Sequence, residues 1–139
     1  DDVIDVIPFS DTPELWKTNG TNKEKLDSLL QKIENHNVGG QTDIYSPVMM
    51  GLDEISKIDL NKYIPAVILM TDGESNHGRT FEDLKGYWTK LGKDIPVFAI
   101  KFGDASDDQL KAISELTRST VFDGTKDLGA AFRKAKGYN

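Results

Sequence analysis

The residue whose position most clearly predicts chemistry in this chain of 139 residues is Asp72. It follows the apolar run AVILM at residues 66–70, from which it is separated by Thr71, and it precedes Gly73. An aspartate at the point where burial stops has a fixed backbone and a carboxylate that faces a crevice, and such oxygens suit hard cations such as Mg²⁺, Mn²⁺ or Ca²⁺. Alternatively, Asp72 and Gly73 form a turn whose carboxylate only caps nearby amides. The pattern alone leaves both interpretations open.

Other polar residues near this point are open to a functional and a structural interpretation. Asp43, beside Thr42, either accepts a hydrogen bond from a residue that binds the metal or caps the helix that follows. The cap is favoured. The segment ESNH at residues 74–77 either shapes ligand choice or is a solvated loop. His77 could act as a general base, but no Ser or Cys nucleophile stands in a recognisable elbow for it to activate. Asp104, Asp107 and Asp108 lack the spacing of a calcium loop.

Apolar runs and helical patterns alternate along the chain. Strands are expected at residues 3–9, 63–71, 95–102 and 119–122, with a short return strand around residues 15–16. Helices are expected after the capping boxes at 21–24 and 106–109, after Ser46-Pro47 and Thr80, and over residues 128–135. The first strand is expected to be covered on both faces, and the first helix to bury Leu26, Leu29, Leu30 and Ile33.

This alternation predicts one α/β domain over residues 1–139, with a mostly parallel sheet and helices on both of its faces. Ligands of such sheets gather beyond the carboxyl ends of the strands. The residues expected there are Ser10, Asp11, residues 72–78, Gly103 and Asp104, and the glycine-rich loop 39–43 can reach the same edge. The edge is therefore where binding is expected.

Composition excludes some function classes. The formal net charge of −6 argues against non-specific binding of nucleic acid, which requires a basic face. Because there is no cysteine, disulfides and thiolate metal sites are excluded. No apolar segment approaches the length of a membrane span, so membrane insertion is not expected. Nothing in the sequence indicates a compartment.

The blocks VIPFSD, GGQTDI, ILMTDG and IPVFAIKFG, in this order and spacing, resemble the body of a von Willebrand factor type A domain. The resemblance covers essentially the whole chain. It implies a doubly wound, Rossmann-type sheet with a metal-ion-dependent adhesion site at its carboxyl edge. Thr42 and Asp72 match the family's loop threonine and later aspartate, so the resemblance implies that they approach a divalent cation, directly or through water. A partner carboxylate would fill an open coordination position, with Asp43, Gly73, Glu74 and Ser75 as candidates for the surrounding rim.

The chain departs from the family at one point. The family's site begins with Asp-x-Ser-x-Ser after its first strand, and no such pattern occurs here. The domain is therefore expected to be amino-terminally incomplete, lacking the first strand and first helix. Since the family's strand order is 3-2-1-4-5-6, the missing strand is central, and its absence would leave an unpaired seam that recruits another strand or a second copy. Thr42 and Asp72 supply only one hydroxyl and one carboxylate, so Mg²⁺ binding by this chain alone is expected to be weak or absent.

The function that follows is a non-enzymatic module that binds a protein partner, through a divalent cation when the site is complete. Two alternatives remain. One is a metal-dependent hydrolase that uses Asp72 and His77, and the other is a scaffold domain whose metal site has decayed. Fold alone does not decide among them.

Overall fold

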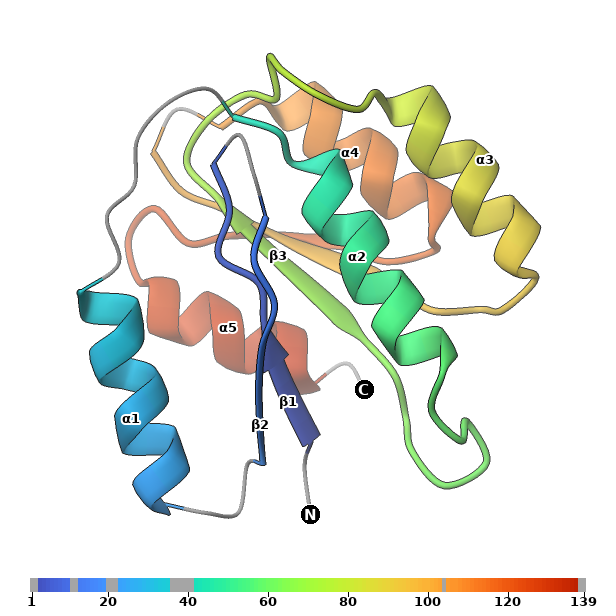
Figure 1. Cartoon of the computed structure of the whole chain (residues 1–139). Helices are drawn as coiled ribbons and strands as arrows, with labels where there is room; N and C mark the ends of the chain where they lie inside the picture. The colour runs from blue at the N-terminus through green and yellow to red at the C-terminus, as the bar shows by residue number, and fades with distance from the viewer. Residues whose placement is uncertain (1–2, 11–12, 20–22, 36–41, 104, 138–139) are drawn as a thin grey trace.

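The computed structural model describes residues 3–10, 13–19, 23–35, 42–103 and 105–137 (Figure 1). The elements occur in the order β1 (Val3–Val6), β2 (Trp16–Asn19), α1 (Lys23–Glu34), α2 (Tyr45–Ser56), β3 (Val67–Thr71), α3 (Phe81–Leu91), β4 (Val97–Lys101), α4 (Asp107–Leu116), β5 (Val121–Asp123) and α5 (Leu128–Gly137). From α2 onward, helices and strands alternate as the sequence predicts. None of the described helices is long and apolar enough to cross a membrane.

Strands β3, β4 and β5 form a parallel sheet in that order. Because successive side chains of a strand face opposite sides, β4 contributes to two cores. Val97 and Ala99 pack in a cluster with α2, α3 and α4, whereas Phe98 and Ile100 pack in a second cluster with α5. Helices thus cover both faces of the sheet, and the predicted α/β class is confirmed.

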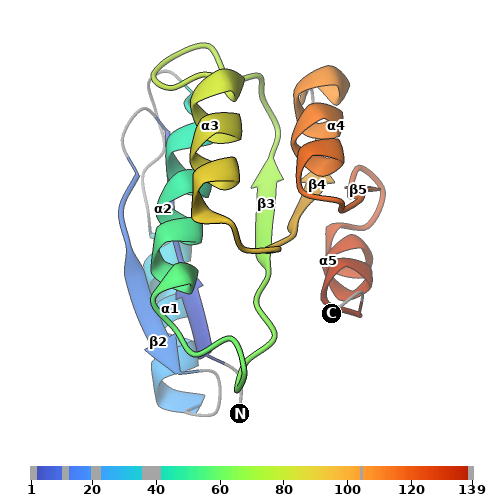
Figure 2. The ribbon, with the colours of Figure 1, turned by 90° about the vertical axis from the view of Figure 1, so that its right-hand side faces the viewer.

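Strands β1 and β2 form a separate antiparallel hairpin (Figure 2). In its register Val3 is opposite Asn19. The return strand is therefore confirmed, but the expectation that residues 3–9 form a strand covered on both faces is wrong. The strand stops at Val6, and Val3 and Ile4 are 60% and 37% exposed. Within the described residues no third strand pairs with the hairpin, so β1 lacks the neighbour that would bury it.

Helix α1 lies against β2, where the ammonium of Lys32 is 4.2 Å from the centre of the Trp16 ring. None of its residues is buried, and Leu30 and Ile33 are 57% and 45% exposed. The predicted buried face of this helix is therefore wrong. A two-stranded hairpin offers too little surface to cover the whole apolar stripe. The Thr21 of its expected capping box lies outside the described residues.

Helix α2 connects the hairpin to the three-stranded sheet. A Cβ atom at Gly51 would lie 3.6 Å from side-chain atoms of both Ile7 and Val67, so the chain just after β1 and the start of β3 flank the same point of α2. Within the described part of the chain, β1 and β3 belong to different sheets and do not pair with each other. That arrangement agrees with the predicted seam, and recruitment of another strand or copy to it stays a prediction.

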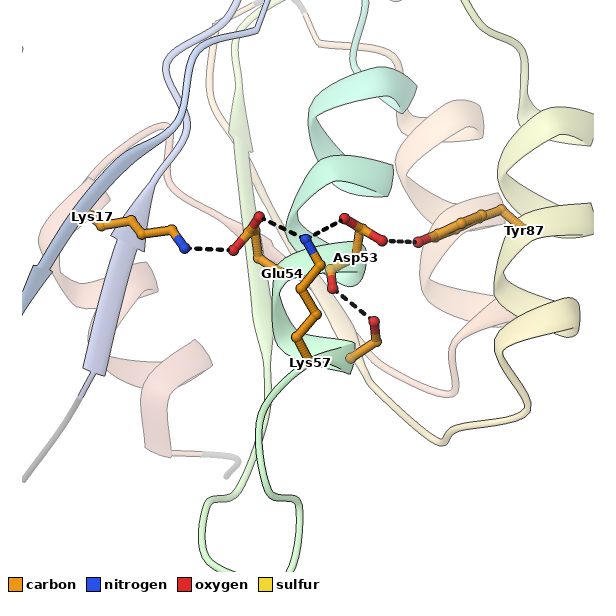
Figure 3. A network of polar contacts seen from close by, with 6 residues as sticks. Lys17, Asp53, Glu54, Lys57 and Tyr87 are labelled. Atoms are coloured by element: carbon orange, nitrogen blue, oxygen red, sulfur yellow. Dashed lines mark hydrogen bonds and ion pairs between the residues drawn. The ribbon is translucent and has the colours of Figure 1, made fainter.

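Polar contacts reinforce this connection (Figure 3). The ammonium of Lys17 on β2 is 2.8 Å from the Glu54 carboxylate of α2, and Lys57 contacts both Glu54 and Asp53 at 3.3 and 3.1 Å. The hydroxyl of Tyr87 on α3 donates to Asp53 at 3.2 Å. The network therefore runs from the hairpin across α2 to α3.

Several element boundaries differ from those predicted. The strands of the parallel sheet are shorter than expected: residue 64 precedes β3, and its side chain is 77% exposed. Helix α2 begins at Tyr45, so Ser46 is not its cap. Thr80 caps α3, as expected, and its capping box with Asp83 is an additional finding; Gly92 ends that helix with a left-handed φ of 62°.

Candidate functional site

Asp72 lies directly after β3, at the carboxyl edge of the sheet, where the sequence placed it. The Thr71 hydroxyl accepts from the Gly73 N–H at 3.3 Å and donates to the Gly73 carbonyl at 3.2 Å, which fixes the turn. The chain after β4 comes close at Gly103, whose φ is +61°; a Cβ there would be only 2.9 Å from the Cβ of Asp72. Asp72 is therefore held between the ends of two parallel strands.

The Asp72 side chain is exposed, and within the described residues its carboxylate has no hydrogen-bond or ion-pair partner. The amide of Gly73 is bonded to Thr71 instead. The alternative in which Asp72 serves only as a turn cap is thus not supported by the described contacts. The carboxylate is available to a ligand.

Thr42 is tied to the loop that follows Asp72. Its carbonyl accepts from the N–H groups of Asn76 and His77 at 2.9 and 3.2 Å, and its own N–H donates to the Asn76 side-chain oxygen at 3.1 Å. Its hydroxyl lies 3.8 Å from the position that a Cβ of Gly73 would occupy. The structure therefore brings Thr42 next to the Asp72-Gly73 turn, as predicted for these two residues.

Asp43 is buried, with 3% of its surface exposed. One carboxylate oxygen accepts from the N–H groups of Tyr45 and Ser46, each at 3.0 Å, and the other accepts from the Ser46 hydroxyl and from the N–H of Arg79 at 3.4 Å. Its carboxylate thus caps the first amides of α2 from the residue before Ile44, the N-cap residue, so the favoured interpretation of Asp43 as a helix cap is confirmed. Gly78 makes room for this carboxylate, because a Cβ there would lie 2.0 Å from an Asp43 oxygen.

Gln109 is a site residue that the sequence misassigned. It was expected to close a capping box with Ser106, and its backbone N–H does donate to the Ser106 hydroxyl at 3.4 Å. Its side chain, however, accepts from the Ser75 N–H at 2.8 Å and donates to the Ser75 carbonyl at 3.0 Å. The Ser75 hydroxyl in turn accepts from the Ile44 N–H at 3.1 Å. The spacing S-x-x-Q is fully accounted for by a cap, so nothing in it pointed to the loop.

The remaining candidates divide into those the structure describes and those it does not. Glu74 and His77 are exposed, and Asp107 and Asp108 lie in the first turn of α4, where the helix dipole favours acids. Asp11, residues 39–41 of the glycine-rich loop and Asp104 lie outside the described residues.

Two blocks of sequence, at residues 42–44 and 68–73, thus meet at one edge of an α/β sheet. A family model for the von Willebrand factor type A domain matches residues 1–133. The chain belongs to the von Willebrand factor type A family. A human relative, inter-alpha-trypsin inhibitor heavy chain H6, is 26% identical over 118 residues, which cover 76% of this chain and 9% of the relative. Domains of the type A family are generally protein-interaction modules rather than enzymes.

The type A family implies a divalent cation, and few of the oxygen donors described at this edge are free to hold one. Among the described residues, no group of three or more histidine or acidic side chains could hold a metal ion. Asp43 is engaged by four donors as a helix cap, which leaves the Asp72 carboxylate and the Thr42 hydroxyl. Two such oxygens are fewer than a protein Mg²⁺ site normally uses, so the described donor set does not fit a complete site.

Proposed function

We propose that this type A domain is a non-enzymatic protein-binding module that engages its partner at the carboxyl edge of the sheet, around Thr42 and Asp72. The observation that supports this most is the unpartnered Asp72 carboxylate beside a loop fixed by hydrogen bonds. Asn76 and His77 hold the loop to Thr42, and Gln109 holds it to α4. A surface ordered before binding loses little conformational entropy when a partner docks.

The proposal includes a divalent cation, Mg²⁺ or alternatively Mn²⁺ or Ca²⁺, that bridges a partner carboxylate to this edge when further ligands complete the site. With Thr42 and Asp72 alone, we expect the affinity of the chain for Mn²⁺ to be no better than about 10⁻⁴ M. Calorimetric titration of the chain with MnCl₂ measures it. Micromolar affinity that Asp72→Asn abolishes would contradict the expectation, because the two donors would then suffice.

The location of the binding surface is tested separately. Peptides selected by display against the immobilised chain at saturating Mg²⁺ should lose most of their binding to Asp72→Asn. The matched control is Asp94→Asn, which removes the same charge at an exposed residue just before β4, away from the carboxyl edge. Equal binding of the peptides to the wild type and to Asp72→Asn would show that the binding surface lies elsewhere.

The hydrolase and scaffold alternatives make different predictions. A hydrolase would turn over p-nitrophenyl phosphate or p-nitrophenyl acetate in the presence of metal, and His77→Ala would abolish the turnover. A scaffold with a decayed site would select peptides whose binding is indifferent to both Asp72→Asn and Mg²⁺. The proposed module should show no turnover and a dependence on Asp72.

A further inference from the structure

A cavity of about 500 Å³ opens on the outer side of the loop that carries Ser75 to Thr80. Its walls come from the first turns of three helices and from the loop itself. The lining residues are Tyr45, Ser75, Asn76, His77, Gly78, Arg79, Thr80, Phe81 and Gln109. This cavity is distinct from the Thr42–Asp72 edge, since neither of those residues lines it.

Tyr45 gives the cavity a hydroxyl group that can donate a hydrogen bond. The residue is only 5% exposed, and its ring packs edge-on against Phe81 with centroids 6.5 Å apart. Within the described residues the Tyr45 hydroxyl has no hydrogen-bond partner, and it is not among the atoms that are closed off from solvent, so it can donate into the cavity that Tyr45 lines. Burial also raises the pKa of this phenol, so it stays a neutral donor. A ligand atom that accepts a hydrogen bond could therefore bind at this position.

The charge of the lining favours an anion. Arg79 and His77 are its titratable or cationic side chains besides Tyr45, and none of the described lining residues is acidic. Within the described chain, one guanidinium N–H of Arg79 contacts the Met49 sulfur at 3.4 Å, which leaves its other donors for a ligand.

Two acids that contact lining residues of the cavity, Asp43 and Asp83, are already engaged as helix caps. Asp43 accepts from Tyr45, Ser46 and Arg79, and Asp83 accepts from the N–H and the hydroxyl of Thr80. The Thr80 donors hold the pKa of Asp83 below its usual range. These caps use the free amides at the starts of α2 and α3. Attraction for an anion in the cavity must therefore come from the Arg79, His77 and Tyr45 side chains.

We infer that this cavity binds a carboxylate side chain of an acidic peptide segment, without a metal ion, next to the edge that the proposed function uses. Arg79 supplies the charge, the Tyr45 hydroxyl supplies a directed donor, and the Tyr45 and Phe81 rings contact the apolar stem of the side chain. The inference rests on the proposed function, because it names the chemistry of the protein partner. The net charge of −6 repels acidic peptides at long range, so any such binding must be local.

The test uses hexaglutamate as the probe and hexaglutamine as its neutral match, with EDTA present throughout. In ¹H–¹⁵N spectra of the whole chain, hexaglutamate should shift the amides of Tyr45, Ser75 to Thr80 and Gln109 more than those of Asp72 to Glu74. Arg79→Gln should weaken binding about tenfold or more, because it removes a charge-assisted hydrogen bond. Arg133→Gln, on α5, removes the same charge from an exposed residue outside the lining and should leave binding unchanged.

The variant Tyr45→Phe removes the hydroxyl but keeps the ring, so it distinguishes a role of the hydroxyl in ligand binding from a role in packing. Removing the hydroxyl should weaken hexaglutamate binding about threefold to tenfold and leave the Tm essentially unchanged, because the hydroxyl has no partner within the described chain. A large fall in Tm would overturn the assignment of this hydroxyl to a ligand.

Other outcomes also overturn the inference. Equal binding of hexaglutamine would refute selection for a carboxylate. Binding of a phosphotyrosine peptide but not of hexaglutamate would assign the cavity to phosphate. Binding that appears only when Mg²⁺ replaces EDTA, with shifts centred on Asp72, would refute this inference while supporting the proposed function.

Discussion

Helices α1 and α2 have the same length of 12 residues, and both carry an apolar stripe, but their surroundings differ. Helix α2 buries residues such as Val48 and Leu52 against the sheet and α3, whereas α1 buries none of its residues. Helix α2 packs against both β3 and α3, whereas α1 packs against β2, one strand of the hairpin. The comparison shows that an apolar period determines which face of a helix turns inward, while burial depends on how much surface lies opposite it.

Replacing a leucine in each helix should give the largest difference between the two regions. Leu52→Ala should lower the free energy of unfolding by about 2–5 kcal/mol, because Leu52 is 0% exposed and its loss leaves a cavity. Leu30→Ala should cost less than about 1 kcal/mol, because Leu30 is 57% exposed. Urea unfolding measures both. A comparable cost at Leu30 would mean that α1 is covered in solution, for example by another copy of the chain.

A pair of glycines tests whether the site loop belongs to the tightly packed region. Gly78 and Gly92 have similar φ values of 73° and 62°, but a Cβ would meet Asp43 at Gly78 and nothing within 4 Å at Gly92. Both alanine variants should lose about 1–2 kcal/mol for the left-handed backbone. Gly78→Ala should lose about 1–2 kcal/mol more, because it displaces the cap of α2. Thermal unfolding of the two variants compares them, and equal losses would show that Asp43 moves aside without cost.

The smallest expected effect is the pH dependence of the contact between the hairpin and α2, where Lys17 pairs with Glu54. Hydrogen bonds from Lys17 and Lys57 hold the pKa of Glu54 below its ordinary value of 4.5. A lowered carboxyl pKa contributes stability above the unfolded-state value, and the contribution is lost as the pH falls through the folded-state value. The hairpin should therefore attach less firmly at a pH below about 4.5, and only slightly so, because the Lys17 ammonium is exposed and solvent screens the pair.

Carbon-detected NMR titration of the Glu54 carboxyl measures this shift. Lys17→Met should move the pKa of Glu54 upward, toward 4.5. Lys23→Met is the matched control, since Lys23 pairs with Asp27 within α1 and should leave Glu54 unchanged. No response to Lys17→Met would show that the ion pair is not populated in solution.

The sequence predicted correctly those features, such as strand ends and helix caps, that depend on neighbouring residues. It placed Asp72 at the end of strand β3, favoured Asp43 as a cap, and identified Thr80 as the cap of α3, because each is determined by neighbours within a few residues. It overestimated the burial of β3, in which Val67, Ile68 and Met70 are only half-buried. It failed for the buried face of α1, because burial there depends on distant partners. It also failed for Gln109, because one local motif explained that residue completely and concealed a contact 34 positions away in the sequence.

The bond pair between Gln109 and Ser75 has a chemical consequence for position 109. The Gln109 amide presents an acceptor and a donor side by side and matches both backbone groups of Ser75, much as an adjoining β-strand would. A glutamate has the same shape but would place an anion against the Ser75 carbonyl, and a leucine would leave both groups without a partner. The position therefore accepts a carboxamide and little else, and the loop that borders both proposed binding surfaces moves only when the start of α4 moves with it.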